Sequence, residues 1–143
     1  MVSTDRLNRT EHGLVRRAVK RAEAGTGLQF CVYLGDVDDA APRVSAEAVF
    51  AAAGLEARPA VLMVVGPAQR RFEIVTGRAA RRRIDDQACA RVAEGMARHF
   101  ARGDLVSGIV TGIAGLAAVA GPGRAPSGGE QVPDVVQGAA QPD

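Results

Sequence analysis

The chain has 143 residues, which suffices for one domain of ordinary size and excludes two full domains. Its formal net charge is only +2, so the field of the whole chain is too weak to recruit nucleic acid or a membrane surface by itself. Aromatic residues make up 3% of the sequence and Trp is absent, which argues against base-stacking platforms, so we expect no nucleic-acid partner.

The first residues and the cysteines indicate the compartment. The opening stretch, MVSTDRLNRTEHG, has no apolar core of a secretory signal, so we expect a cytoplasmic protein. Cys31 and Cys89 are too few for a disulfide scaffold, and neither has a second Cys or a His at metal-ligand spacing. We therefore expect two free thiols.

The first half of the chain predicts a helix, a strand and a second helix. Asn8 and Glu11 are spaced as a capping box, and apolar residues then recur at helical spacing over residues 9–24. Residues 28–34 alternate with the period of a β-strand. After a turn rich in carboxylates, Pro42 begins a short helix that a glycine at position 54 ends.

The second half predicts two strands and two helices. Residues 60–65, AVLMVV, are apolar throughout, which is typical of a central strand covered on both faces. Residues 71–76 alternate as a half-exposed strand, and the short connection forces this strand antiparallel to the one before it. Asp85 or Asp86 caps the next helix after an arginine-rich turn, and the last helix covers about residues 105–119.

These elements predict a single compact α/β domain. We expect a small mixed β-sheet packed with about four helices, in which the first strand is parallel to the second and the third is antiparallel to it. The expected organisation is a flexible arm at 1–6, the domain at 7–120, and a disordered tail rich in Gly, Pro, Ser and Gln at 121–143.

The order of these elements resembles the TPM domain. The likeness covers roughly residues 14–116, and its most telling pieces are Thr26-Gly27, Arg71 to Gly77, Asp86 and Gly103-Asp104. The closest likeness is to a bacterial branch of unknown function. Resemblance to this family implies the same small mixed sheet, and it suggests calcium binding, weak acid phosphatase activity or maintenance of membrane complexes, which have been linked to other members.

Four carboxylates form the first candidate site. Three of them, Asp36, Asp38 and Asp39, follow the strand at 28–34. The directions of the strands and helices predict that Asp104 lies at the same edge of the sheet. With carbonyls and water, such a set could hold a hard cation such as calcium, although its spacing matches no EF-hand loop. The simpler interpretation, which we favour, is that these residues are solvated turn formers and helix caps.

Arginines form the second candidate site. They crowd both ends of the third strand and the approach to the next helix, as Arg70, Arg71, Arg78, Arg81, Arg82 and Arg83. The last four could bind a phosphate or a carboxylate at a helix N-terminus. However, Asp85 and Asp86 would fill the place of that anion, and a solvated face is the favoured interpretation.

Nucleophilic catalysis and membrane insertion find less support in the sequence. The chain has no G-x-S-x-G elbow and no Cys-His signature, and His99 is more simply a partner of a helix C-terminus. Residues 105–123 carry no charge, but Gly108-x-x-x-Gly112 equally suits close packing of the helix on the sheet. Membrane association is therefore not favoured.

The leading functional hypothesis is a TPM-like binding or interaction module with a protein partner and with calcium as a candidate ligand, because no acid, base and nucleophile converge. The first alternative is a weak metal-dependent phosphatase-like hydrolase that uses Asp36, Asp38 and Asp104. The second is a membrane-associated accessory factor that acts through the last helix.

Overall fold

The computed structural model describes residues 7–36, 40–67, 71–124 and 134–137. Within these ranges the elements, in chain order, are α1 (Arg9–Thr26), β1 (Gln29–Leu34), α2 (Pro42–Ala52), β2 (Ala60–Gly66), β3 (Arg71–Thr76), α3 (Arg78–Arg81), α4 (Asp86–Ala101), α5 (Leu105–Ala120) and β4 (Val135–Gln137).

The four strands form one mixed sheet in the order β3-β2-β1-β4. The predicted relations hold, because β1 runs parallel to β2 and β3 runs antiparallel to it. Val32 of β1 is aligned with Met63 of β2 on one side and with Val135 of β4 on the other. β1 is therefore an inner strand, although the sequence placed only β2 at the centre.

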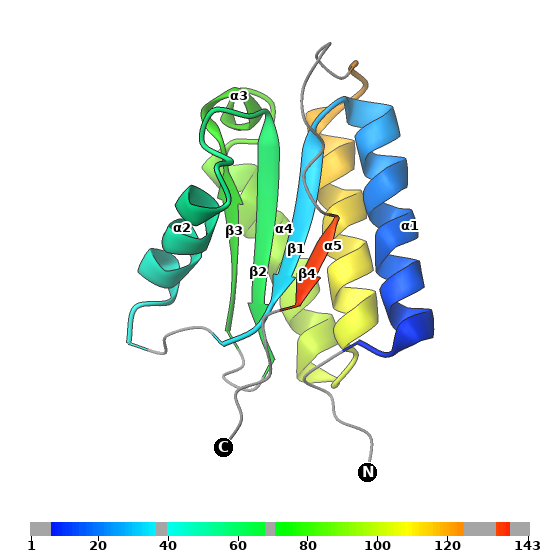
Figure 1. The fold of residues 1–143 in the computed structure, drawn as a ribbon. Coiled ribbons are helices and arrows are strands. Elements are labelled where there is room, and N and C mark those ends of the chain that lie inside the picture. Colours follow the sequence, from blue (N-terminus) through cyan, green and yellow to red (C-terminus); the bar gives the residue numbers. More distant parts are fainter. Residues whose placement is uncertain (1–6, 37–39, 68–70, 125–133, 138–143) are drawn as a thin grey trace.

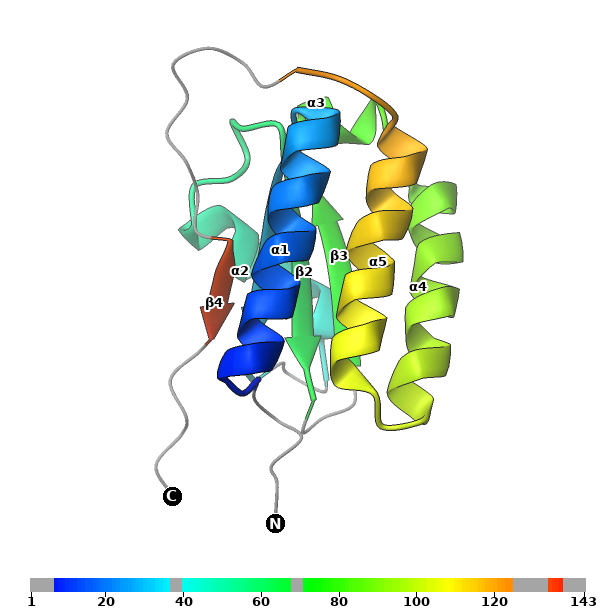
Figure 2. The same cartoon turned by 90° about the vertical axis from the view of Figure 1, so that its right-hand side faces the viewer.

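Helices cover the sheet unequally on its two faces. Figures 1 and 2 show α1, α5 and α4 side by side on one face and α2 alone on the other. The larger core lies under the three helices and includes the fully buried side chains of Phe30, Met63, Met96 and Ile113. The smaller core lies under α2 around Phe50. The domain thus has three layers, with most of its apolar burial on one face.

Local signals explain where α1 begins and ends. The side chain of Asn8 accepts from the backbone N–H of Glu11 over 2.8 Å, and the Glu11 carboxylate accepts from the N–H of Asn8 over 2.9 Å, which confirms the predicted capping box. Gly27 ends the helix with φ of 77°, a conformation that favours glycine. The buried Thr26 hydroxyl donates to the Ala22 carbonyl over 2.7 Å, so the helix continues two residues beyond the predicted end.

The glycines of α5 allow close packing, mainly against another helix. An added Cβ at Gly108 would meet the ring of Phe100, and one at Gly112 would lie 2.5 Å from the Met96 sulfur. Only Met63, at 2.9 Å from that second position, belongs to the sheet. The close approach is thus chiefly between α5 and α4. Across the described part of the chain, no helix is long and apolar enough to cross a membrane.

One expectation needs correction. The tail at 121–143 was expected to be disordered, but residues 135–137 form β4 beside β1, because they supply backbone partners and two apolar side chains to the open edge of the sheet. The arginine-rich turn after β3 contains the four-residue helix α3, and the described residues contain five helices, in line with the expected count of about four.

Candidate functional site

Of the carboxylate candidates, Asp36 just after β1 and Asp104 just before α5 lie at the same end of the sheet (Figure 1). Asp36 is exposed there, whereas Asp38 and Asp39 lie outside the described residues. Among the residues that can be described, no three His, Cys, Asp or Glu side chains gather closely enough to hold a metal ion. Calcium at this end stays a prediction.

Asp104 has a structural role at this end. Its side chain is the N-cap of α5 and accepts from the backbone N–H of Ser107 over 3.1 Å. Hydrogen bonds from Ser107, followed by the nearby charges of His99 and Arg102, hold the pKa of the Asp104 carboxyl below its ordinary value. A capping carboxylate is what the simpler interpretation of this residue expected.

Of the second candidate set, the arginines at 78, 81, 82 and 83 lie in or just after α3, at the opposite end of the sheet from the end of β1 (Figure 1), whereas Arg70 lies outside the described residues. Arg83 does not point freely into solvent. Its guanidinium donates to the carbonyls of Thr26 and Gly121 over 2.7 Å each and to that of Ala120 over 3.3 Å. Arg83 therefore ties the C-terminal ends of α1 and α5 together, where the partial negative charge of each helix favours a cation.

Of the other arginines of this set, one contacts the backbone and two are exposed to solvent. Arg81 donates to the Thr76 carbonyl over 3.2 Å, whereas Arg78 and Arg82 are exposed. Asp85 caps α4 by accepting from the Ala88 N–H over 2.8 Å, as predicted. An anion site at Arg78, Arg81, Arg82 and Arg83 stays a prediction, and two of its members already bond to carbonyls.

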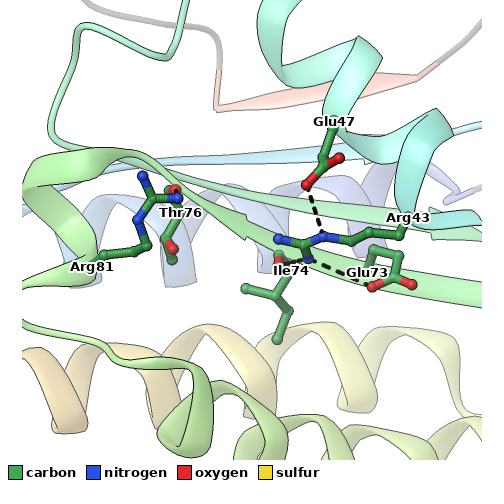
Figure 3. A network of polar contacts seen from close by, with 6 residues as sticks. All are labelled: Arg43, Glu47, Glu73, Ile74, Thr76 and Arg81. Carbon is green, nitrogen blue, oxygen red and sulfur yellow. Dashed lines mark hydrogen bonds and ion pairs between the residues drawn. The ribbon is translucent and has the colours of Figure 1, made fainter.

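A further arginine cluster was not singled out from the sequence. Arg43 of α2 donates to the Ile74 carbonyl of β3 over 2.7 Å, and its guanidinium lies 3.2 Å from Glu47 and 3.7 Å from Glu73 (Figure 3). The i,i+4 spacing of Arg43 and Glu47 was readable from the sequence. Their contact with β3 was not, because it joins residues 31 positions apart.

The thiols are poor nucleophiles in this structure. Cys31 is buried in the smaller core, and its burial, followed by the charges of Asp134 and Glu23, raises the pKa of its thiol to about 11. Partial burial and the charge of Asp86 also raise the pKa of Cys89. These raised pKa values favour the protonated thiol, which is a weaker nucleophile than the thiolate.

A hollow runs between α1 and α5. Its first part has a volume of about 510 Å³, and small apolar residues dominate its walls, which are Ala18, Arg21, Ala22, Gly25, Thr26, Val110, Ala114, Ala117, Ala118, Gly121 and Pro122. Figure 2 shows the two helices lying side by side in front of the sheet. We call this hollow the α1–α5 groove.

The groove continues toward the N-terminal end of α5. This second part has a volume of about 430 Å³, shares Ala18, Arg21 and Val110 with the first, and adds Leu14, Arg17, His99, Val106, Ser107 and Thr111. The His99 ring lies 3.4 Å from the Thr111 hydroxyl through Nε2 and 3.2 Å from the Arg102 guanidinium through Nδ1. The end of the groove beside the start of α5, its lower end, is thus more polar than the upper end beside the last turn of α5.

Charge is distributed on one side of the groove only. Arg17 and Arg21 are exposed, one turn apart on α1, whereas α5 carries no charged residue along its length. Leu14 adds an exposed apolar side chain, 44% accessible, at the lower end. This site was not predicted from the sequence, because it forms only where α1 and α5 pack together and the pairing of the two helices was not predicted.

Comparisons with solved structures identify the fold. The chain resembles the NMR structure of the BA42 protein from the psychrophilic bacterium Bizionia argentinensis, with TM-score 0.74, 17% identity, and 92% of this chain and 95% of that chain covered. It also resembles an N-terminal domain from P. gingivalis, with TM-score 0.64, 17% identity, and coverage of 82% and 78%. At these identities the likeness shows the fold alone.

A third similar structure is the N-terminal domain of the cg2496 protein from Corynebacterium glutamicum, with TM-score 0.66, 12% identity, and coverage of 96% of this chain and 85% of that one. No curated protein is similar enough to count as a match. One family model matches residues 4–117, which is most of the chain. The chain therefore belongs to the DUF5130 family, described as a domain of unknown function.

Proposed function

We propose that this domain is a TPM-like interaction module, which receives an acidic, amphipathic segment of a partner protein in the α1–α5 groove. The observation that carries the proposal is the pairing of an apolar floor with a basic rim on one side. The order of elements and the Thr26-Gly27 and Gly103-Asp104 pieces support the TPM likeness.

The floor of the groove suits close approach of another chain. Ala18, Ala114 and Ala118 project no more than a methyl group, so the backbone of a bound segment can come near both helices. Apolar side chains of the partner would therefore lose their contact with water at this seam, which is the main favourable contribution to most protein association.

The rim selects the charge of the partner. Arg17 and Arg21 flank the floor on α1, and the uncharged α5 forms the facing wall. A segment with carboxylates along one side and apolar residues along the other would place its negative charge against these two guanidiniums. Arginine forks match carboxylates well, and such complementarity fixes orientation more than it adds affinity.

The chemistry of the candidate catalytic groups favours binding over catalysis. His99 lies within contact distance of Thr111 and Arg102, and burial raises the pKa of both thiols. The phosphatase alternative depends on a carboxylate set of which only Asp36 and Asp104 are described, and Asp104 caps α5. The membrane alternative would use the same basic rim on anionic lipid, so the test must separate lipid from peptide.

Selection from an unbiased peptide display library tests the proposal. The wild-type domain should enrich peptides that combine Asp or Glu with apolar residues at helical spacing. The double variant Arg17→Glu/Arg21→Glu should reverse the preference toward basic peptides, because the rim then carries the opposite charge. The matched control is Arg91→Glu/Arg98→Glu on α4, which changes the net charge equally at exposed positions that do not line the groove.

The outcomes are distinct. Enrichment of acidic amphipathic peptides that is reversed only by the α1 variant would support the groove as the site. Equal effects of both double variants would show a response to net charge alone and would reject it. Co-sedimentation with vesicles of phosphatidylglycerol, together with failure to enrich any peptide, would assign the surface to a membrane instead.

A further inference from the structure

The sheet ends at β3 on one side, and without the tail strand β4 it would end at β1 on the other. These two edges differ in how they are protected from pairing with another strand. On β3, the carbonyls of Ile74 and Thr76 accept hydrogen bonds from Arg43 and Arg81, over 2.7 and 3.2 Å (Figure 3). These guanidiniums occupy acceptors that an added strand would need, so the β3 edge is blocked by side chains of the domain itself.

The edge of β1 is covered differently, by the chain's own tail. Val135–Gln137 pair with Val32–Leu34 in parallel register, and the Val32 N–H donates to the Asp134 carbonyl over 3.0 Å. Figure 1 shows β4 as a short arrow outside β1, far along the sequence from its neighbour. The β1 edge therefore already binds an extended peptide segment.

Side chains give this segment a specific chemistry. The Asp134 side chain is 7% exposed, and its Oδ2 lies 3.2 Å from Lys20 Nζ and 3.8 Å from Arg16 Nε. Val135 packs against the larger core and Val136 against the smaller core. The edge thus accepts a carboxylate followed by two apolar residues that point to opposite faces of the sheet.

Two other features weaken the pairing of the tail strand with β1. β4 has only three residues. Oδ1 of Asp134 and Oε1 of Gln137 are buried and make no hydrogen bond with any described residue. An unsatisfied buried acceptor is destabilising, so these two atoms offset part of what a three-residue ladder contributes.

From this contrast we infer that the β1 edge is a peptide-docking site. In this proposal β4 occupies the site in the free chain, and a partner peptide can displace it. The occupant it fits is an extended segment of a partner protein that carries an acidic residue followed by two β-branched residues. Such a segment would add to the sheet as β4 does, a recognised mode of peptide binding. Arg16 and Lys20 serve this edge, whereas Arg17 and Arg21 line the α1–α5 groove, so the two sites are independent.

The test uses the full chain and a fluorescent peptide of the tail sequence QVPDVVQGA as the probe. Val136→Pro removes a backbone N–H from β4 and should release the tail, whereas Val136→Ala keeps that donor and is the matched control. If the tail covers the edge more than about 90% of the time, its release should lower the apparent Kd for the probe about tenfold or more. Fluorescence anisotropy measures this change.

Two charge variants make the test specific. A probe with Asn in place of Asp134 should bind the Val136→Pro chain several-fold more weakly, and Lys20→Glu in that chain should have a similar effect. Circular dichroism establishes that each variant is folded. Equal affinity of the folded Val136→Pro and Val136→Ala chains would overturn the proposal, as would insensitivity to both charge changes. A wild-type dimer that exchanges its tails would also overturn the partner assignment, because the occupant would then be a second copy.

Discussion

Gly112 of α5 packs directly against the sulfur of Met96 of α4. A Cβ built at Gly112 would lie 2.5 Å from that sulfur and 2.9 Å from the Met63 methyl group, which is closer than side chains tolerate. Because Met96 is fully buried, it has little room to move away. The glycine therefore fixes the separation of α4 and α5, and with it the position of the wall that α5 contributes to the groove.

Gly112→Ala should destabilise the domain even though alanine is the better helix former. Overpacking of a buried site typically costs about 1–3 kcal/mol, against about 1 kcal/mol gained from helix propensity. The control is Gly95→Ala on α4, where an added Cβ meets nothing within 4 Å and should stabilise the helix. Chemical denaturation measures both effects. Stabilisation by both substitutions would show that the α4–α5 contact is loose.

Arg83 provides a second prediction, because one side chain joins three carbonyls at the ends of α1 and α5. Arg83→Met should lower the free energy of unfolding by about 2–3 kcal/mol, since partly buried carbonyls lose charged donors. Arg83→Lys should recover little of the loss, because an ammonium lacks the planar fork. Arg82→Met, at an exposed neighbour, is the control and should be nearly neutral. Equal losses at both positions would remove the special role of Arg83.

Cys31 predicts a pH dependence of stability. Burial raises the pKa of its thiol to about 11, above the value of 9.0 for an unperturbed thiol, so the folded state keeps a proton that the unfolded state releases. The corresponding stability is fully present below pH 9, falls as pH rises from 9 to 11, and amounts to at most about 3 kcal/mol.

The measurement is urea denaturation across that pH range for the wild type and for Cys31→Ala. The substitution should flatten the decline above pH 9, whatever its effect at neutral pH. In the wild type, Cys31 should react with a thiol reagent only after unfolding, and this reaction should be absent in Cys31→Ala. A decline of equal slope in both proteins would assign the alkaline sensitivity to other groups.

Substitutions of Asp104 distinguish a helix-capping role from a metal-binding role for this residue. If it acts as an N-cap, Asp104→Ala should destabilise the domain, whereas Asp104→Asn should have a much smaller effect, since Asn also caps helices well. Neither difference should depend on calcium. Thermal melts with calcium or with a chelator make the comparison. A stabilisation by calcium that Asp104→Asn or Asp36→Asn removes would instead establish a cation site.

Much of the fold was predictable because its signals are local. The capping box at Asn8 and Glu11, the apolar run of β2 and the Asp85 cap depend on neighbours within a few positions, and the structure confirms each one. The short connection from β2 to β3 likewise determined their antiparallel pairing. Local chemistry also explains why Asp104 was recognised as a possible cap.

The features that were missed depend on contacts between distant residues. β4 is a three-residue strand within a Gly- and Pro-rich tail, and its structure depends on the β1 edge and on Lys20, which is more than a hundred positions away. The groove arises only when α1 and α5 pack as neighbours. Arg83 appeared as part of a solvated charge run, since nothing near it in sequence reveals the carbonyls that it bonds.

The central claim is that the α1–α5 groove holds an acidic partner segment, and a photo-crosslinking amino acid at Ala114 tests it most directly. Ala114 is exposed and lines the groove, whereas the exposed Ala48 of α2 belongs to the helix on the opposite face and is the control position. Irradiation in the native cells should give an adduct at position 114, and its crosslinked peptide should be acidic and amphipathic. Arg17→Glu/Arg21→Glu should abolish that adduct. Adducts of equal yield at both positions, or a crosslinked peptide without acidic residues, would contradict the account.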